Sequence, residues 1–301
     1  MTIRPMRDDE RDQVALLIHQ STNHWYQKNR GFEVFPGEAG DCRLFTDVYE
    51  DLDPGCCLVA VADDGGIVGS CFYHPRETHV SLGIMNVHPG AACRGVARAL
   101  LDAIIKRAEG MPVRLVSSAM NLDSYSLYTK AGFTPLALYQ DMQFPKPPDT
   151  GDVPGATETI RGATIDDTRQ MADLEMALTG IRREKDYRYF ITNQQGVWHT
   201  LVCEEGGTIT GFLTAINHPA SCMLGPGVCR NWQVALRLIL AHHKRAPGRQ
   251  PVFLVPADEA GLISRLYRLG ARNLELHVSQ VLGESITTTG VVMPTFMPET
   301  G

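Results

Sequence analysis

One segment in the first half of the chain has the composition of an anion-binding turn. It reads Ile84-Met-Asn-Val-His-Pro-Gly-Ala-Ala-Cys-Arg-Gly-Val-Ala-Arg-Ala-Leu-Leu101, with a strand-like start, small residues in the middle and a helical apolar pattern at the end. Gly95 and Ala97 are small enough for a phosphate to approach the main chain. A helix that begins here presents unpaired N–H groups and the positive end of its dipole. The segment therefore predicts an anion site, here for a pyrophosphate, although a plain strand–loop–helix connection explains such a turn equally often.

A second segment, Asn121-Leu-Asp-Ser-Tyr-Ser-Leu-Tyr-Thr-Lys-Ala-Gly-Phe133, makes the interpretation specific. Together the two segments resemble the GNAT N-acetyltransferase superfamily, and the resemblance covers about residues 2–145. The first matches the pattern V-x-P-x-x-Q/R-x-x-G-x-G/A-x-x-L-L at Val87, Pro89, Gly95, Ala97, Leu100 and Leu101. The second matches N-x-x-A-x-x-L-Y-x-K-x-G-F at Asn121, Leu127, Tyr128, Lys130, Gly132 and Phe133. Two positions depart from the patterns, since Ala92 stands at the Q/R position and Ser124 at the A position.

The resemblance implies that acetyl-CoA is the co-substrate. The strands expected at 78–87 and 113–119 would splay apart, and the pantetheine arm would pair with the backbone near Met85 and Val87 like an added strand. Because Ala92 is short, the phosphates are left to backbone donors, with Arg94 or Arg98 as the counter-charge. For Asn121, a role as helix N-cap is an equally good interpretation. The expected cofactor-binding residues are Met85, Val87, Cys93, Arg94, Gly95, Val96, Ala97, Arg98, Asn121 and Ser124.

The resemblance also implies that a neutral amine attacks the thioester directly in a ternary complex. Tyr128 is expected to be the general acid that protonates the leaving thiolate, and a core tyrosine is the alternative. No carboxylate lies on the strand that carries an acidic base in the family. His79 is therefore the expected base, against the alternative of an ordinary strand histidine. Glu33, Asp41 and Glu77 are further candidates.

The acceptor is expected to be a small-molecule amine or a peptide. His19, His24, Trp25 and Tyr26 occupy the region in which the family builds its acceptor site, and core packing explains them equally well. The formal net charge of −6 suits a cationic small molecule. The sequence does not indicate which amine is used.

Composition excludes several other classes of function. No basic run predicts nucleic-acid binding, and the apolar stretches are too short to span a bilayer. The N-terminus turns acidic at once and lacks the apolar core of a secretory signal, so we expect a cytoplasmic protein. The eight cysteines form no C-x-x-C pair and are expected to be reduced and mostly buried. His218, His242 and His243 lack metal-ligand spacing, so no metal is expected; a homodimer is one alternative for the assembly.

The pattern of elements predicts a mixed α+β fold of two tandem GNAT-like domains. Each would have a mostly antiparallel central sheet flanked by helices, because the order of elements is not a regular βαβ alternation. Four prolines and two glycines between Pro145 and Gly155 indicate a linker. The expected division is 1–149 for the acetyl-CoA-binding domain, 150–155 for the linker and 156–301 for a degenerate second domain.

The second half repeats the first weakly. Leu201-Val-Cys-Glu-Glu-Gly-Gly-Thr-Ile-Thr-Gly-Phe follows the pattern of the hairpin Leu58-Val-Ala-Val-Ala-Asp-Asp-Gly-Gly-Ile-Val-Gly. Alignment through these hairpins places Asn231 at Gly95, and alignment on the later glycine places Leu266 at Tyr128. We therefore expect one CoA per chain. Two alternatives remain, a non-catalytic acyl-CoA-binding or sensing protein and an interaction protein built from degenerate domains.

Overall fold

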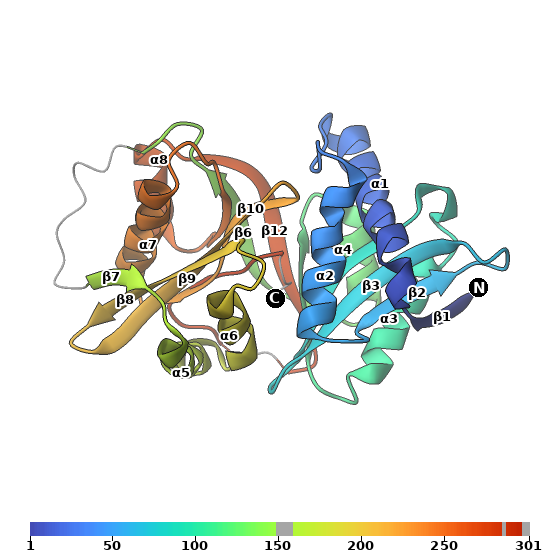
Figure 1. The fold of residues 1–301 in the computed structure, drawn as a ribbon, viewed down its shortest axis with the longest axis horizontal. Helices are drawn as coiled ribbons and strands as arrows, with labels where there is room; N and C mark the ends of the chain where they lie inside the picture. The colour runs from blue at the N-terminus through green and yellow to red at the C-terminus, as the bar shows by residue number, and fades with distance from the viewer. Residues whose placement is uncertain (149–158, 285–286, 297–301) are drawn as a thin grey trace. The chain divides into compact units, whose positions relative to one another are not determined.

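The structure is a computed structural model that describes residues 1–148, 159–284 and 287–296 (Figure 1). The chain divides into two compact units, each considered by itself. Within the described residues, unit 1 comprises Met1–Pro75, His79–Leu115 and Phe296, and unit 2 comprises Arg76–Thr78 and Val116–Thr295. The linker expected at 150–155 lies outside the described residues.

Unit 1 is a mostly antiparallel sheet with helices on both faces. The strands follow the order β1-β2-β3-β4-β5, and only the β4–β5 pair is parallel. Strand β5 continues past the boundary of the unit at Leu115. The elements are β1 (Thr2–Pro5), α1 (Arg11–Arg30), α2 (Arg43–Leu52), β2 (Cys57–Val61), β3 (Ile67–Pro75), β4 (Val80–Val87), α3 (Val96–Arg107) and β5 (Val113–Ser118).

Two neighbouring residues show which helix covers which face of unit 1. A Cβ atom added to Gly69 would lie 2.6 Å from Val96 Cγ1, so α3 packs directly on β3 at this glycine. Asn86 donates to Ser21 Oγ (2.7 Å) and Thr22 Oγ1 (3.1 Å) of α1. Gly69 pairs with Val87 and not with Asn86, and successive residues of a strand point to opposite faces. Helices α1 and α3 therefore cover opposite faces of the sheet.

Unit 2 has the same layered plan. Its strands follow the order β12-β6-β11-β10-β9-β8-β7, and β13 pairs with β10. The elements are α4 (Leu122–Lys130), β6 (Thr134–Gln143), β7 (Thr159–Gly162), α5 (Thr168–Thr179), α6 (Glu184–Thr192), β8 (Trp198–Glu205), β9 (Thr208–His218), β10 (Ser221–Cys229), α7 (Trp232–Arg245), β11 (Val252–Pro256), α8 (Ala260–Arg268), β12 (Arg272–Leu282) and β13 (Val291–Met293). The predicted class, mixed α+β with a mostly antiparallel sheet flanked by helices, is confirmed.

Strand β6, which ends the first half of the sequence, pairs with strands of the second half. It runs antiparallel to β12 from Thr134 to Gln143 and antiparallel to β11 from Tyr139 to Met142. This pairing places residues 116–148, with helix α4, in unit 2. The boundaries 1–149 and 156–301 stay a prediction about the repeated sequence, whereas the compact units follow the strand pairing.

The two units repeat one core. Gly211 of β9 matches Gly69, because its added Cβ would lie 2.5 Å from Val234 Cγ1 of α7. Both units also carry a β-bulge on the strand that follows. In β4 it lies between Leu82 and Met85, and in β10 between Leu224 and Gly227. A bulge bends its strand and redirects the backbone beyond it. The internal repeat expected from the hairpins is therefore present in the structure.

Candidate active site

Residues 93–98, here called the anion turn, join β4 to α3 in unit 1. Gly95 is the N-cap of α3 and has a φ of +79°, and Cys93 also has a positive φ, +62°. Glycine adopts this left-handed conformation at little cost, whereas Cys93 does so at some strain. A short 3₁₀ helix precedes the turn, and its Gly90 N–H donates to His88 Nδ1 at 3.1 Å. The chain therefore enters α3 through a tight, exposed bend.

The backbone amides of the anion turn are available to a ligand. The first main-chain bond of α3 runs from Ala99 N–H to Gly95 O at 3.0 Å. Among the described residues, no acceptor lies on the N–H groups of residues 93–98. Arg98 is engaged through Nε by both carboxylate oxygens of Asp102, at 2.8 and 2.9 Å. Arg94 is exposed and has no ion-pair partner within the described chain, which makes it the better candidate for a counter-charge.

The outer edge of β4, defined as Met85–Val87 on the side away from β3, pairs with no strand among the described residues. Strand β4 pairs with β5 at Val80 and Ser81, and no described residue continues the ladder on that side. On the other side, Met85 and Val87 pair with Cys71 and Gly69 of β3. An open edge presents N–H and C=O groups that can bind an extended ligand.

His79, the expected base, lies just before β4 and is only 2% exposed. Its Nε2 is 3.0 Å from Ser81 Oγ. A second buried histidine was missed by sequence reasoning. His74 Nδ1 lies 2.7 Å from Asp53 Oδ2, and His74 pairs with Ser81 across β3 and β4. Asp53 and His74 belong to no sequence motif. Their contact follows from the position of Asp53 at the end of α2 and from the register of β3.

The second motif belongs to unit 2. Asn121 is the N-cap of α4, and its Oδ1 accepts a hydrogen bond from Ser124 N–H at 3.2 Å. The capping role of Asn121 is therefore present in the structure. Tyr128 is 6% exposed, and its ring centroid lies 5.8 Å from that of Phe133. The sequence-predicted site residues thus fall into two groups, with His79, β4 and the anion turn in unit 1 and Asn121, Ser124 and Tyr128 in unit 2.

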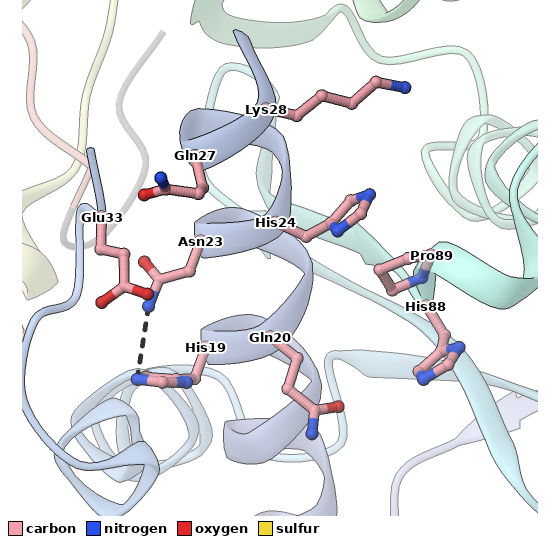
Figure 2. Close-up of a pocket in the computed structure, with 9 residues that line it drawn as sticks. All are labelled: His19, Gln20, Asn23, His24, Gln27, Lys28, Glu33, His88 and Pro89. Atoms are coloured by element: carbon pink, nitrogen blue, oxygen red, sulfur yellow. Dashed lines mark hydrogen bonds between the residues drawn. The ribbon is translucent and has the colours of Figure 1, made fainter. Parts of the chain in front are cut away.

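An open pocket of about 600 Å³, lined mainly by polar residues of α1, reaches His88 and Pro89 ahead of the anion turn in unit 1 (Figure 2). Figure 2 shows His24 and Lys28 leaving α1 on the side of His88 and Pro89, while Asn23 and Gln27 leave it on the side of Glu33. The lining residues are His19, Gln20, Asn23, His24, Gln27, Lys28, Glu33, His88 and Pro89.

The loop after α1 holds the far wall of this pocket in place. Asn23 donates to Phe35 O at 2.8 Å and accepts from Phe35 N–H at 2.9 Å, and His19 Nε2 lies 3.1 Å from Gly37 O. His19, His24 and Glu33 therefore line the same pocket.

The other residues proposed for this region lie elsewhere. Trp25 and Tyr26 do not line the pocket and pack edge to face at 4.9 Å. Asp41 sits in the short 3₁₀ helix before α2. Glu77 belongs to unit 2 and pairs with Arg182 at 3.5 Å.

The helix of unit 2 that matches α3 begins differently from α3. Helix α7 begins after Asn231, whose Oδ1 accepts from Val234 N–H at 3.0 Å, so a side chain of the protein caps this helix. Phe133 N–H bonds Tyr128 O after α4, and Ala271 N–H bonds Leu266 O after α8. This shared pattern confirms that Leu266 stands where Tyr128 stands in the first copy.

Three further features bear on the classes of function considered. In the part of the chain that the structure describes, no three His, Cys, Asp or Glu side chains are grouped as metal ligands. No helix among the described residues is both long and apolar enough to cross a membrane. The eight cysteines are thiols and form no disulfide in the described part of the chain, and Cys93 in the anion turn is exposed.

Comparison with known proteins places the chain in a family. The model of the acetyltransferase (GNAT) family matches residues 20–133, and that of the acetyltransferase (GNAT) domain matches residues 171–288. No curated protein matches the sequence.

Three solved structures share the fold over nearly the whole chain. A Pyrococcus horikoshii protein proposed to be an acetyltransferase has a TM-score of 0.77 at 16% identity, covering 97% of this chain and 92% of its own. A GCN5-related N-acetyltransferase from Sphaerobacter thermophilus has a TM-score of 0.65 at 18% identity, covering 96% and 98%. A tandem GNAT protein from the clavulanic acid biosynthesis pathway has a TM-score of 0.61 at 16% identity, covering 95% and 99%. The chain therefore belongs to the GNAT acetyltransferase family, carries two GNAT domains in tandem and is an acyltransferase.

Proposed function

We propose that unit 1 binds acetyl-CoA and that the protein transfers the acetyl group to a primary amine of a small molecule or peptide. The observation that carries this proposal is the anion turn, where several amides without acceptors and Arg94 converge on one exposed bend. The GNAT family generally uses acetyl-CoA. The outer edge of β4 offers the amides of a pantetheine arm a strand to pair with.

Acetyl-CoA would supply the activated thioester. The amine nitrogen attacks the thioester carbonyl, the C–N bond forms, and the C–S bond breaks with departure of the thiolate. His79, held by Ser81, is proposed to take the amine proton directly or through a water. Tyr128 is proposed to give its proton to the thiolate. Because the amine attacks the thioester directly, no covalent enzyme intermediate is required.

The pocket of α1, Glu33, His88 and Pro89 is proposed to hold the acceptor. Glu33 would attract a protonated amine, and the amides of Gln20 and Gln27 would bind hydroxyl or carbonyl groups. The net charge of −6 favours the approach of a cation. These features support a hydrophilic amine over an apolar one.

A titration and a turnover assay together test the proposal. Calorimetry with acetyl-CoA is expected to saturate at one molecule per chain, because Asn231 caps the second helix. Release of CoA thiol in the presence of an amine panel is expected to depend on the amine. A stoichiometry of two would contradict the assignment of the cofactor to unit 1 alone.

The second candidate is an acyl-CoA-binding protein without catalysis. The burial of His79 and the short Ala92 in the Q/R position favour it. Saturable binding of acetyl-CoA without CoA release for any amine would support this candidate and reject the enzyme.

A further inference from the structure

Residues 287–295, here called the strap, carry β13 and lie in unit 2. Strand β13 runs antiparallel to β10 and pairs Val291 with Cys229, Val292 with Val228 and Met293 with Gly227. The described residues of β10 thus have β9 on one side and β11, then β13, on the other.

The internal repeat shows what this position corresponds to. In unit 1, Val87 pairs with Gly69, and Met85 follows the β-bulge. In unit 2, Cys229 pairs with Gly211, and Gly227 follows the bulge in the same register. Residues 227–229 are therefore the counterparts of Met85–Val87. The strap occupies in unit 2 the edge that is open in unit 1.

The strap fits this edge closely. Val291 and Met293 are fully buried while Val292 between them is partly exposed, as expected for a strand with one face in a core. A Cβ atom on Gly290 would lie 2.5 Å from Cys229 O, and one on Gly225 would lie 2.7 Å from Pro294 O. Thr289 N–H donates to Leu178 O at 2.7 Å, and this hydrogen bond ties the strap to the C-terminal turn of α5.

Among the described residues, none at this edge provides for the phosphates of CoA. The helix that follows β10 is capped by Asn231, and the added Cβ of Gly261 would lie 3.0 Å from Trp232 Nε1, so Trp232 packs against α8. This edge can therefore recognise a ligand through backbone hydrogen-bond donors and acceptors. It also buries apolar side chains at alternate positions of the paired segment, as it does those of Val291 and Met293. Such an edge selects a peptide strand.

We propose that the outer edge of β10 is a peptide-binding site whose resident ligand is the strap of the same chain. The site takes an extended segment with apolar residues at alternate positions and rejects CoA. A chain with a displaced strap would accept a matching peptide from another molecule at this edge. This inference concerns unit 2 and does not depend on the acetyl transfer proposed for unit 1.

The full-length Gly290→Ala variant tests the proposal. Its Cβ would collide with Cys229 O at a φ of +72°, so the strap should unseat. We expect the amides of residues 227–229 that face β13 to exchange hydrogen at least about 10-fold faster than in the wild type. Gly248→Ala is the matched control, because Gly248 has a φ of +84° and nothing within 4 Å of its added Cβ.

Addition of a synthetic peptide of residues 287–296 to Gly290→Ala completes the test. At up to about 1 mM, typical of the effective concentration of a tethered segment, the peptide is expected to restore protection of residues 227–229. The same peptide with Asp at both Val291 and Met293, and acetyl-CoA, are expected not to do so. Unchanged exchange in Gly290→Ala, or protection by acetyl-CoA in place of the peptide, would overturn the proposal.

A second variant keeps the test decisive should Gly290→Ala not fold. Met293→Ala leaves the strap backbone free to pair but empties one buried socket. A smaller rise in exchange confined to residues 227–229 is expected, and an exchange rate equal to that of the wild type would count against the site.

Discussion

In unit 1 the helix after the bulged strand begins at Gly95, and its first amides face solvent without acceptors among the described residues. In unit 2 the equivalent helix begins after Asn231, and the side chain of that residue accepts a hydrogen bond from Val234 N–H. The units differ again at the outer edge of β4, which is matched in unit 2 by an edge that pairs with the strap. The two copies of the sequence, although not the two units, also differ at Tyr128, which is matched by Leu266.

The scaffold beneath these differences is shared. Arg4 binds Glu10 in unit 1, and Arg161 binds Asp167 in unit 2, each tying the first strand to the turn that follows. Gly69 and Gly211 let a helix approach the sheet equally closely. Unit 2 forms this core although Asn231 caps its helix and the strap covers residues 227–229, so the fold requires neither an uncapped helix start nor an unpaired edge. We infer that these two features serve ligand binding in unit 1.

Tyr128→Phe is the substitution with the largest expected effect. A general acid typically contributes about 10²–10⁴-fold, so turnover should fall by that factor while the affinity for acetyl-CoA stays nearly unchanged. Steady-state kinetics and calorimetry measure the two quantities. Tyr267→Phe is the matched control, because Tyr267 follows Leu266 in α8, is 47% exposed and bonds Gln140. If turnover of Tyr128→Phe stays within about a factor of two, Tyr128 is structural.

Gly95→Glu tests the anion turn itself. The carboxylate would fill the phosphate space and repel the ligand, so acetyl-CoA affinity should fall at least about 10²-fold, equivalent to about 3 kcal/mol. Gly248→Glu adds the same charge at a similar φ, +84°, on the exposed surface of unit 2 and should leave affinity unchanged. Equal acetyl-CoA affinities of the two folded variants would show that the phosphates do not bind at this turn.

Much of this comparison was predictable from the sequence, and its limits have physical causes. The helix that starts near Arg94, the match of Asn231 with Gly95 and the match of Leu266 with Tyr128 follow from local spacing. That Asn231 caps its helix is shown only by the structure. The pairing of β6 with β12 and β11 joins segments far apart in the sequence, so it cannot be predicted from the pattern of residues 134–143 alone. The strap was also missed, because three apolar residues flanked by Gly290 and Pro294 resemble a loop. The Asp53–His74 contact depends on the register of β3 and on the end of α2.

A smaller effect is expected from Gly69→Ala and Gly211→Ala, which compare the scaffolds directly. Each new Cβ would meet a valine Cγ1 atom, at 2.6 and 2.5 Å, so each variant should lose about 1–3 kcal/mol of stability. Denaturant unfolding followed by hydrogen exchange reads each unit separately. Only Gly69→Ala should also weaken acetyl-CoA binding, because α3 begins at the anion turn. A loss of binding in Gly211→Ala would mean that unit 2 takes part in holding the ligand.

The acid sensitivity of the two arginine–carboxylate pairs gives the smallest expected difference. In unit 1 the hydrogen bonds from Arg4, at 2.7 and 2.5 Å, outweigh burial and lower the pKa of Glu10 from 4.5 to about 2. In unit 2 the hydrogen bonds from Arg161, at 2.7 and 2.8 Å, lower the pKa of Asp167 from 3.8 to about 2. Both carboxylates therefore bind a proton more readily in the unfolded chain than in the folded one.

The sign of the pH dependence follows from these shifts. The stabilisation is complete above the unfolded pKa values, near pH 4–5, and is lost as the pH falls towards 2, because the unfolded state then binds more protons. At about 1.4 kcal/mol per pKa unit, the Glu10 pair contributes at most about 3.5 kcal/mol and the Asp167 pair at most about 2.5 kcal/mol. The free energy of unfolding, measured in urea between pH 5 and 2.5, should fall less steeply in Glu10→Gln and in Asp167→Asn than in the wild type.

The two variants should differ in one respect. Arg161 also binds Glu204 at 2.7 Å and so keeps an anionic partner in Asp167→Asn, whereas the structure gives Arg4 only Glu10 as an ion-pair partner among the described residues. Together with the larger pKa shift of Glu10, this means that Glu10→Gln should flatten the pH dependence more. Asp166→Asn removes an exposed neighbouring carboxylate and serves as the control. If the free energy of unfolding changed equally with pH in all three variants and the wild type, these ion pairs would make no contribution to the pH dependence of stability.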